Sequence, residues 1–145
     1  MVEQNMALVR RWFEEVWNQK RSETIRELLS PDFVAHETSE AGGDLYGVEG
    51  FLGLHARLVG AFPDMHIEVQ DCFGVGEKVA FRWAGTMHHD GNGLGMEATG
   101  AEIRITGMGI VRIVGGKVVE TWDNWDKLTM FRQIEAAAKA KSAGA

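Results

Sequence analysis

The chain has little cysteine, little proline and no long apolar segment, and these shortages exclude several classes of protein. Its single cysteine among 145 residues cannot form a disulfide within the chain, which excludes a disulfide-framed fold and favours a reducing, cytoplasmic location. No apolar run approaches the roughly 20 residues that a membrane-spanning helix needs. Residues 1–11 also lack the apolar core of a signal peptide. We therefore expect a cytoplasmic protein with no membrane partner.

Positive charge is also scarce. The chain has 15 Lys and Arg against 21 Asp and Glu, which gives a net charge of −6. Binding to a nucleic-acid backbone needs a basic surface, so we expect no nucleic-acid partner. The 45% share of hydrophobic residues is typical of a globular protein with its own core. The length predicts one domain over residues 1–135, and the small and polar residues 136–145 predict a flexible tail.

The apolar pattern changes its period along the chain. Up to Pro63, apolar residues recur at steps of three and four, which is typical of amphipathic helices; after it, they alternate as in strands. Helices are predicted over residues 3–18, 22–29, 48–62 and 127–135. Strands are predicted over residues 32–38, 66–73, 79–86, 102–114 and 117–125. Gly115-Gly116 is a hairpin signal between the last two strands.

Helices followed by hairpin-connected strands indicate an α+β fold. We expect the N-terminal helices to pack on one face of a strongly curved antiparallel or mixed sheet. Such a layering encloses a cone-shaped pocket, which is the natural place for a small apolar ligand. The glycine-rich segment 89–95 is predicted to be a flexible flap over the mouth of this pocket.

The sequence does not support a metal or dinucleotide site. Segment 89–95 lacks the acidic residue that would complete a calcium loop, and no βαβ unit surrounds its glycines. His88 and His89 are adjacent in a strand, so they point to opposite faces and only one of them can enter the pocket. We expect neither a metal nor a cofactor.

Four short motifs follow one another along the chain. They are Ser30-Pro31-Asp32-Phe33-Val34, Gly95-Met96-Glu97-Ala98-Thr99-Gly100, the hairpin 112–118, and Asp123-Asn124-Trp125-Asp126 with Phe131-Arg132-Gln133-Ile134. In this order and spacing they resemble the SnoaL-like polyketide (ester) cyclases of the nuclear transport factor 2-like superfamily. The resemblance covers nearly the whole chain.

The resemblance implies a cone-shaped α+β barrel and a specific reaction. The family's cyclases close a ring in a polyketide ester by intramolecular aldol condensation, without a metal or an organic cofactor. The resemblance also implies a homodimer whose sheets pack back to back. Four apolar residues are predicted to face outward and support such contact: Met108, Ile110, Val114 and Trp122.

Asp123 is the candidate general acid and base. The resemblance places it where the family carries an acidic residue on the last strand. Alternation puts Val119, Thr121, Asp123 and Trp125 on one face, and a carboxyl group in an apolar cavity has a raised pKa. Such a group can remove a proton from an activated carbon and return one to oxygen. The alternative, purely structural roles for Asp123 are a cap on the following helix or an ion pair with Arg112.

Other residues are predicted to complete the site. His36 is a second catalytic candidate, which would donate to a substrate carbonyl or orient Asp123. Gly107 and Gly109 stand where the family's cyclases carry a Gln and a His, and are expected to leave space there. Side chains predicted to line the substrate pocket are Trp125, Trp83, His89 and His55.

Three functions are compatible with these residues. The leading hypothesis is a cofactor-independent cyclase acting on a small, apolar, carbonyl-rich molecule. The second is another enzyme on the same scaffold, either an epoxide hydrolase or a ketosteroid-isomerase-like enzyme. The third is a non-catalytic module for ligand binding or dimerisation, which the loss of the polar pair at Gly107 and Gly109 would favour.

Overall fold

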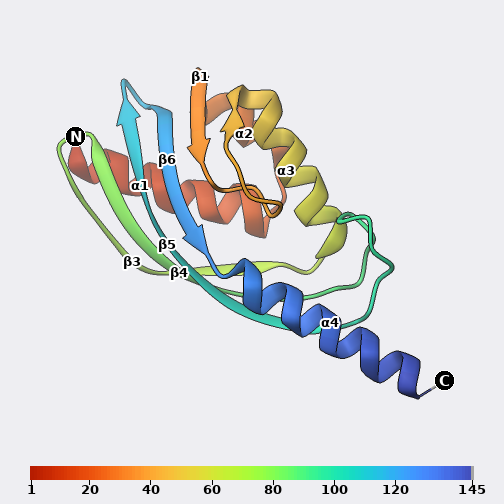
Figure 1. Ribbon diagram of the computed structural model, residues 1–145. Helices are drawn as coiled ribbons and strands as arrows, with labels where there is room; N and C mark the ends of the chain where they lie inside the picture. The colour runs from red at the N-terminus through yellow and green to blue at the C-terminus, as the bar shows by residue number, and fades with distance from the viewer. Residues whose placement is uncertain (145) are drawn as a thin grey trace.

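The computed structural model describes residues 1–144. They form a curved six-stranded sheet covered by helices (Figure 1). The α+β class predicted from the sequence is confirmed. The helices are α1 (Val2–Trp12), the π-helix η1 (Phe13–Asn18), α2 (Ser22–Leu28), α3 (Gly47–Ala61) and α4 (Lys127–Ala143). The strands are β1 (Leu29–His36), β2 (Leu45–Tyr46), β3 (His66–Val75), β4 (Lys78–His88), β5 (Glu102–Val114) and β6 (Lys117–Trp125).

The strands form one mixed sheet in the order β2-β1-β6-β5-β4-β3. Only the pair β1 and β6 is parallel within the described sheet. The helix α3 and four strands separate β1 from β6 along the chain, which gives the long crossover that a parallel pair needs. Figure 1 shows β3 to β6 bending around the N-terminal helices, with α3 on the same side and α4 projecting from one end. The core therefore lies between the concave face of the sheet and α1, η1 and α3.

Apolar spacing explains how the helices are oriented. In the first helical segment, the residues at core spacing are buried: Val9, Phe13, Val16 and Trp17 are each at most 9% exposed. Their polar neighbours face solvent, so burial of one apolar stripe holds the segment on the sheet. None of the helices in residues 1–144 is long and apolar enough to cross a membrane.

A β-bulge sets which residues of β6 face inward. Ile113 pairs with Val118 while the preceding Arg112 pairs with Glu120, so Val119 is an additional residue in β6. Val118 is therefore buried, at 3% exposure, where simple alternation would have placed Val119. Beyond the bulge the alternation resumes, and Asp123 faces the helices.

The structure corrects the secondary-structure prediction at two places. The helix predicted over 3–18 changes at Phe13 into a π-helix, in which the Gln19 N–H donates to the Glu14 carbonyl five residues earlier at 2.9 Å. The helix predicted over 127–135 continues to Ala143, because the alanines and lysines that follow residue 135 have high helix propensity. The last residue of the chain, position 145, lies outside the described residues.

Candidate active site

Asp123 lies near the C-terminal end of β6 and points into the interior of the protein. Its Oδ1 is buried and has no hydrogen-bond partner in the structure. Burial away from water raises the pKa of this carboxyl group to about 7, although the nearby Trp83 indole N–H and the Lys127 ammonium group act in the opposite direction. A carboxyl group with this pKa can accept and return a proton near neutral pH.

The two structural roles considered for Asp123 belong to other residues. The cap of α4 is Asp126, whose side chain accepts a hydrogen bond from the Thr129 N–H at 3.0 Å. Arg112 pairs with Glu120, with 3.3 Å between Nε and Oε1. Asp123 therefore neither caps the helix nor forms an ion pair with Arg112.

Two apolar cavities meet at Asp123. Each has a volume of about 60 Å³. Four residues line both of them: Phe13, Trp17, Thr38 and Asp123. The first cavity extends toward α3, β3 and β4, where Leu54, Leu58, Phe62, Ile67 and Trp83 line it. The second extends toward α1, β1 and the start of α3, where Leu8, Trp12, Phe33 and Phe51 line it. A carboxyl group at the junction of two apolar spaces can reach the middle of a ligand that occupies both.

The glycines of β5 do not leave space in the cavity, contrary to expectation. Gly107 is paired with Trp83 and Gly109 with Phe81 on the neighbouring strand β4. A Cβ at Gly107 would lie 2.5 Å from Cε2 of Trp83, and one at Gly109 would lie 2.6 Å from Cζ of Phe81. The two rings therefore cover the glycines, and the cavity wall here is aromatic.

Trp125 and Trp83 both line the first cavity. The Trp125 indole N–H donates to the Thr38 carbonyl at 2.8 Å, which fixes the ring across the end of β1. The Lys127 ammonium group lies 5.7 Å from the centroid of the same ring. Trp83 is 6% exposed, and its indole nitrogen has no partner.

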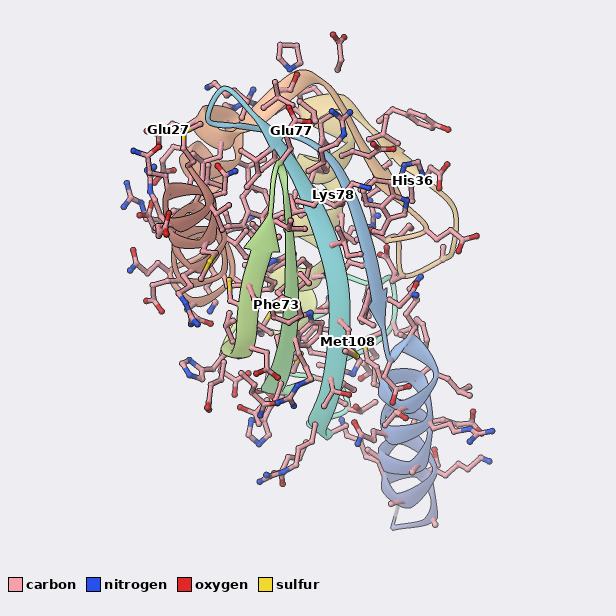
Figure 2. All side chains as sticks on the ribbon, turned by 90° about the vertical axis from the view of Figure 1, so that its left-hand side faces the viewer. Glu27, His36, Phe73, Glu77, Lys78 and Met108 are labelled. Atoms are coloured by element: carbon pink, nitrogen blue, oxygen red, sulfur yellow. The ribbon has the colours of Figure 1, made fainter. Side chains whose placement is uncertain are left out.

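His36 lies on the opposite face of the sheet from Asp123. It pairs with Trp122, whose side chain points away from the helices, and the two rings stack with centroids 5.2 Å apart. Its Nε2 is 2.6 Å from Oε2 of Glu120. Figure 2 looks onto this outer face and shows His36 at the side of β6. The structure thus does not bring His36 and Asp123 together.

The remaining histidines are distributed between the core and the surface. His55 is buried behind Trp17, and its Nε2 is 2.8 Å from the Val16 carbonyl; burial lowers its pKa. His89 is fully buried, its Nδ1 is 2.9 Å from the Thr99 hydroxyl, and burial lowers its pKa too. His88 is exposed and paired with Asp64 at 2.7 Å. Of the adjacent pair, His89 is therefore the one that faces in, but neither His55 nor His89 lines the two cavities.

Segment 89–95 is packed against α3 instead of forming a free flap. The Gly91 N–H donates to the Ala61 carbonyl at 3.1 Å. A Cβ at Gly93 would lie 2.6 Å from the backbone nitrogen of Ala61, so the loop and the last turn of α3 are in backbone contact. The glycines of this segment permit close packing on α3 and do not make it a mobile flap.

Three residues shared by both cavities were not predicted as site residues. Phe13 and Trp17 belong to the π-helix, and their spacing indicated only burial. A π-helical turn is wider than an α-helical one and is frequently found at functional sites. Thr38 follows β1 in a loop and carries no signal in the sequence.

A curved sheet with helices packed on its concave face is the fold of the nuclear transport factor 2-like α+β barrels. Residues 7–134 match the family model of the SnoaL-like polyketide cyclase, and the chain belongs to this family. Among residues 1–144, no three His, Cys, Asp or Glu side chains are grouped so that they could hold a metal ion.

Individual relatives agree with this assignment. The chain is 30% identical over 128 residues to the aklanonic acid methyl ester cyclase DnrD of Streptomyces peucetius, covering 88% of each protein. It is 30% identical to IdmH of Streptomyces antibioticus, a proposed polyketide cyclase, with a TM-score of 0.77 over 91% of this chain and 99% of that one. A SnoaL-like protein of Jannaschia sp. CCS1 is 24% identical and has the same fold, with a TM-score of 0.84 and 94% of each chain covered.

Proposed function

We propose that this protein is a cofactor-independent cyclase that acts by general acid and base catalysis on a small, apolar, carbonyl-rich ester. The observation that carries the proposal is the buried, unpartnered Oδ1 of Asp123 at the junction of two apolar cavities. A cytoplasmic location is part of the proposal and rests on the sequence.

The reaction uses one group in two protonation states. The Asp123 carboxylate takes a proton from a carbon flanked by carbonyl groups, and the electron pair moves onto a carbonyl oxygen to form an enolate. The enolate carbon then attacks a second carbonyl of the same molecule, which forms a carbon–carbon bond and an alkoxide. Asp123 returns its proton to that alkoxide. The two cavities would hold the two parts of the molecule on either side of this bond, which favours intramolecular reaction.

Membership in the family leads to a defined first assay. The name of DnrD describes a cyclase of aklanonic acid methyl ester. We therefore propose aklanonic acid methyl ester as the probe substrate for this chain. His36 takes no part in the proposed proton transfer, since it lies on the other face of the sheet.

Asp123→Asn is expected to lower turnover of this ester by about 10²–10⁴-fold, the usual effect of a missing general base. Binding, followed by tryptophan fluorescence, is expected to change little. In the wild type, kcat/KM should rise with pH and level off above an apparent pKa near 7, because only the ionised group is a base.

Asp126→Asn is the matched control. Asparagine caps a helix as well as aspartate does, so this variant should keep wild-type turnover. Undiminished turnover in Asp123→Asn would contradict the proposal. Binding of the ester without turnover by the wild type would do so as well, and would indicate a binding module.

We further propose that the protein is a homodimer formed through the outer face of the sheet. Phe73 on β3 and Met108 on β5 are 65% and 61% exposed, and Ile110 is 41% exposed. Figure 2 shows Phe73 and Met108 on the strands of this face. Contact with a second sheet would remove these side chains from water.

A further inference from the structure

The cavity wall holds a hydrogen-bond donor that the proposed base does not use. The indole Nε1 of Trp83 is buried and has no partner in the structure. An indole N–H can only donate, so it needs an acceptor. Buried polar groups in proteins are nearly always paired, and one that lines a cavity without a partner points to an acceptor on a ligand.

The register of the sheet brings this donor toward Asp123. Trp83 on β4 is opposite Gly107 on β5. In the next row across the sheet, Phe81 on β4 is opposite Gly109 on β5, and Gly109 is opposite Asp123 on β6. A side chain on β5 would normally separate the β4 indole from β6. Because Gly107 has none, the indole lies over its backbone, with Nε1 2.7 Å from where a Cβ would be.

The Trp83 indole N–H and the Asp123 carboxyl group are close, but neither satisfies the hydrogen-bonding capacity of the other. The Trp83 N–H lowers the pKa of Asp123 as a hydrogen-bond donor does, yet neither Nε1 nor Oδ1 has a partner in hydrogen-bond geometry. Both groups also line the first cavity. A ligand oxygen placed between them would accept from the indole while its neighbouring carbon faces the base.

We propose that Trp83 is a second catalytic residue, whose indole N–H donates a hydrogen bond to the carbonyl oxygen that becomes the enolate. This inference rests on the proposed function. The proton moves from carbon to the Asp123 carboxylate, the electron pair moves onto the carbonyl oxygen, and Trp83 keeps its own proton throughout. Gly107 is the positioning residue, because any side chain there would displace the indole. The donor favours a molecule that carries an acceptor oxygen beside the carbon that loses its proton.

The first test is independent of turnover and uses 2-naphthol, whose phenolic oxygen resembles an enol. The chain has five tryptophans, so its ¹⁵N–¹H spectrum should contain five indole signals, and the one lost in Trp83→Phe is that of Trp83. We expect 2-naphthol to move this signal downfield and naphthalene, which has no oxygen, to leave it near its original position. Equal effects of the two compounds, or no binding of 2-naphthol up to its solubility limit, would overturn the inference.

The second test removes the N–H while keeping the ring. Replacement of Trp83 by 3-benzothienylalanine exchanges N–H for sulfur in a ring of nearly the same shape. If one oxyanion donor is lost, kcat for aklanonic acid methyl ester should fall by about 10²-fold or more with little change in KM. Gly107→Ala should have a similar effect although Trp83 is intact. Unchanged kcat in the benzothienylalanine variant would overturn the role of Trp83.

The outcomes separate this inference from the proposed function. One set of outcomes supports the cyclase proposal and overturns the role of Trp83. In it, Asp123→Asn abolishes turnover, the benzothienylalanine variant keeps turnover, and the Trp83 signal does not respond to 2-naphthol. If the signal responds but the wild type has no turnover, the donor site stands and the cyclase proposal falls.

Discussion

At the scale of the residue, the burial that tunes Asp123 as a base also destabilises the fold. Below about pH 4 the group is protonated in the folded and the unfolded chain alike. Between about pH 4 and pH 7 the unfolded chain loses this proton while the folded chain keeps it, because the pKa in the folded chain is about 7. The free energy of unfolding is therefore expected to fall across this window and to level off above it.

Asp123→Asn should remove this loss. The free energy of unfolding of the variant minus that of wild type is expected to be larger at pH 8 than at pH 4, by at most about 4 kcal/mol. Urea unfolding followed by circular dichroism measures this difference at each pH. For Asp126→Asn, this difference in the free energy of unfolding should change slightly in the opposite direction with pH, since the pKa of Asp126 is lowered by its hydrogen bonds to Thr129. Parallel stability curves for wild type and Asp123→Asn would show that the carboxyl group is not buried as described.

At the scale of the element, contact between segment 89–95 and α3 depends on glycine. In Gly93→Ala the new methyl group would meet the backbone of Gly60 and Ala61, which cannot move without opening the contact. We expect a loss of about 1–3 kcal/mol in the free energy of unfolding. Gly53→Ala, within α3 and with its nearest neighbour the Arg57 guanidinium at 3.4 Å, should instead gain about 0.5–1 kcal/mol.

These two variants are compared by urea unfolding at one pH. Both variants add one methyl group to a glycine. Changes of opposite sign in the free energy of unfolding would therefore reflect the different space around the two glycines. Equal stability of the two variants would mean that the loop is free to move away from α3, as the sequence alone had indicated.

At the scale of the whole molecule, the exposed outer face of the sheet should decide the oligomeric state. Met108→Lys is expected to convert the proposed dimer into monomer at micromolar concentration, because a charge on this face cannot be buried against a second copy. Leu128→Lys is the matched control, since Leu128 is also 61% exposed but lies on α4. Light scattering after size-exclusion chromatography measures both; a monomeric wild type would contradict the proposed dimer.

Local patterns predicted most of the fold and one part of the site. The change of apolar period and the Gly115-Gly116 hairpin were readable because each depends on neighbouring residues. The inward side of Asp123 was also predicted, although the bulge at Val119 means that simple alternation does not hold along the whole strand. The surroundings of Gly107 were predicted wrongly, since the ring that covers it comes from Trp83 on another strand.

The sequence by itself determined most of the elements, the α+β class, the family resemblance and the candidate acid, because these follow from spacing and residue type along the chain. Only the tertiary structure decided that His36 and Asp123 lie on opposite faces, that segment 89–95 is packed on α3, and that Trp83 reaches across Gly107. The physical reason is that pairing register and side-chain packing join residues far apart in the chain. The environment of the carboxyl group, and hence its raised pKa, exists only once those segments have come together.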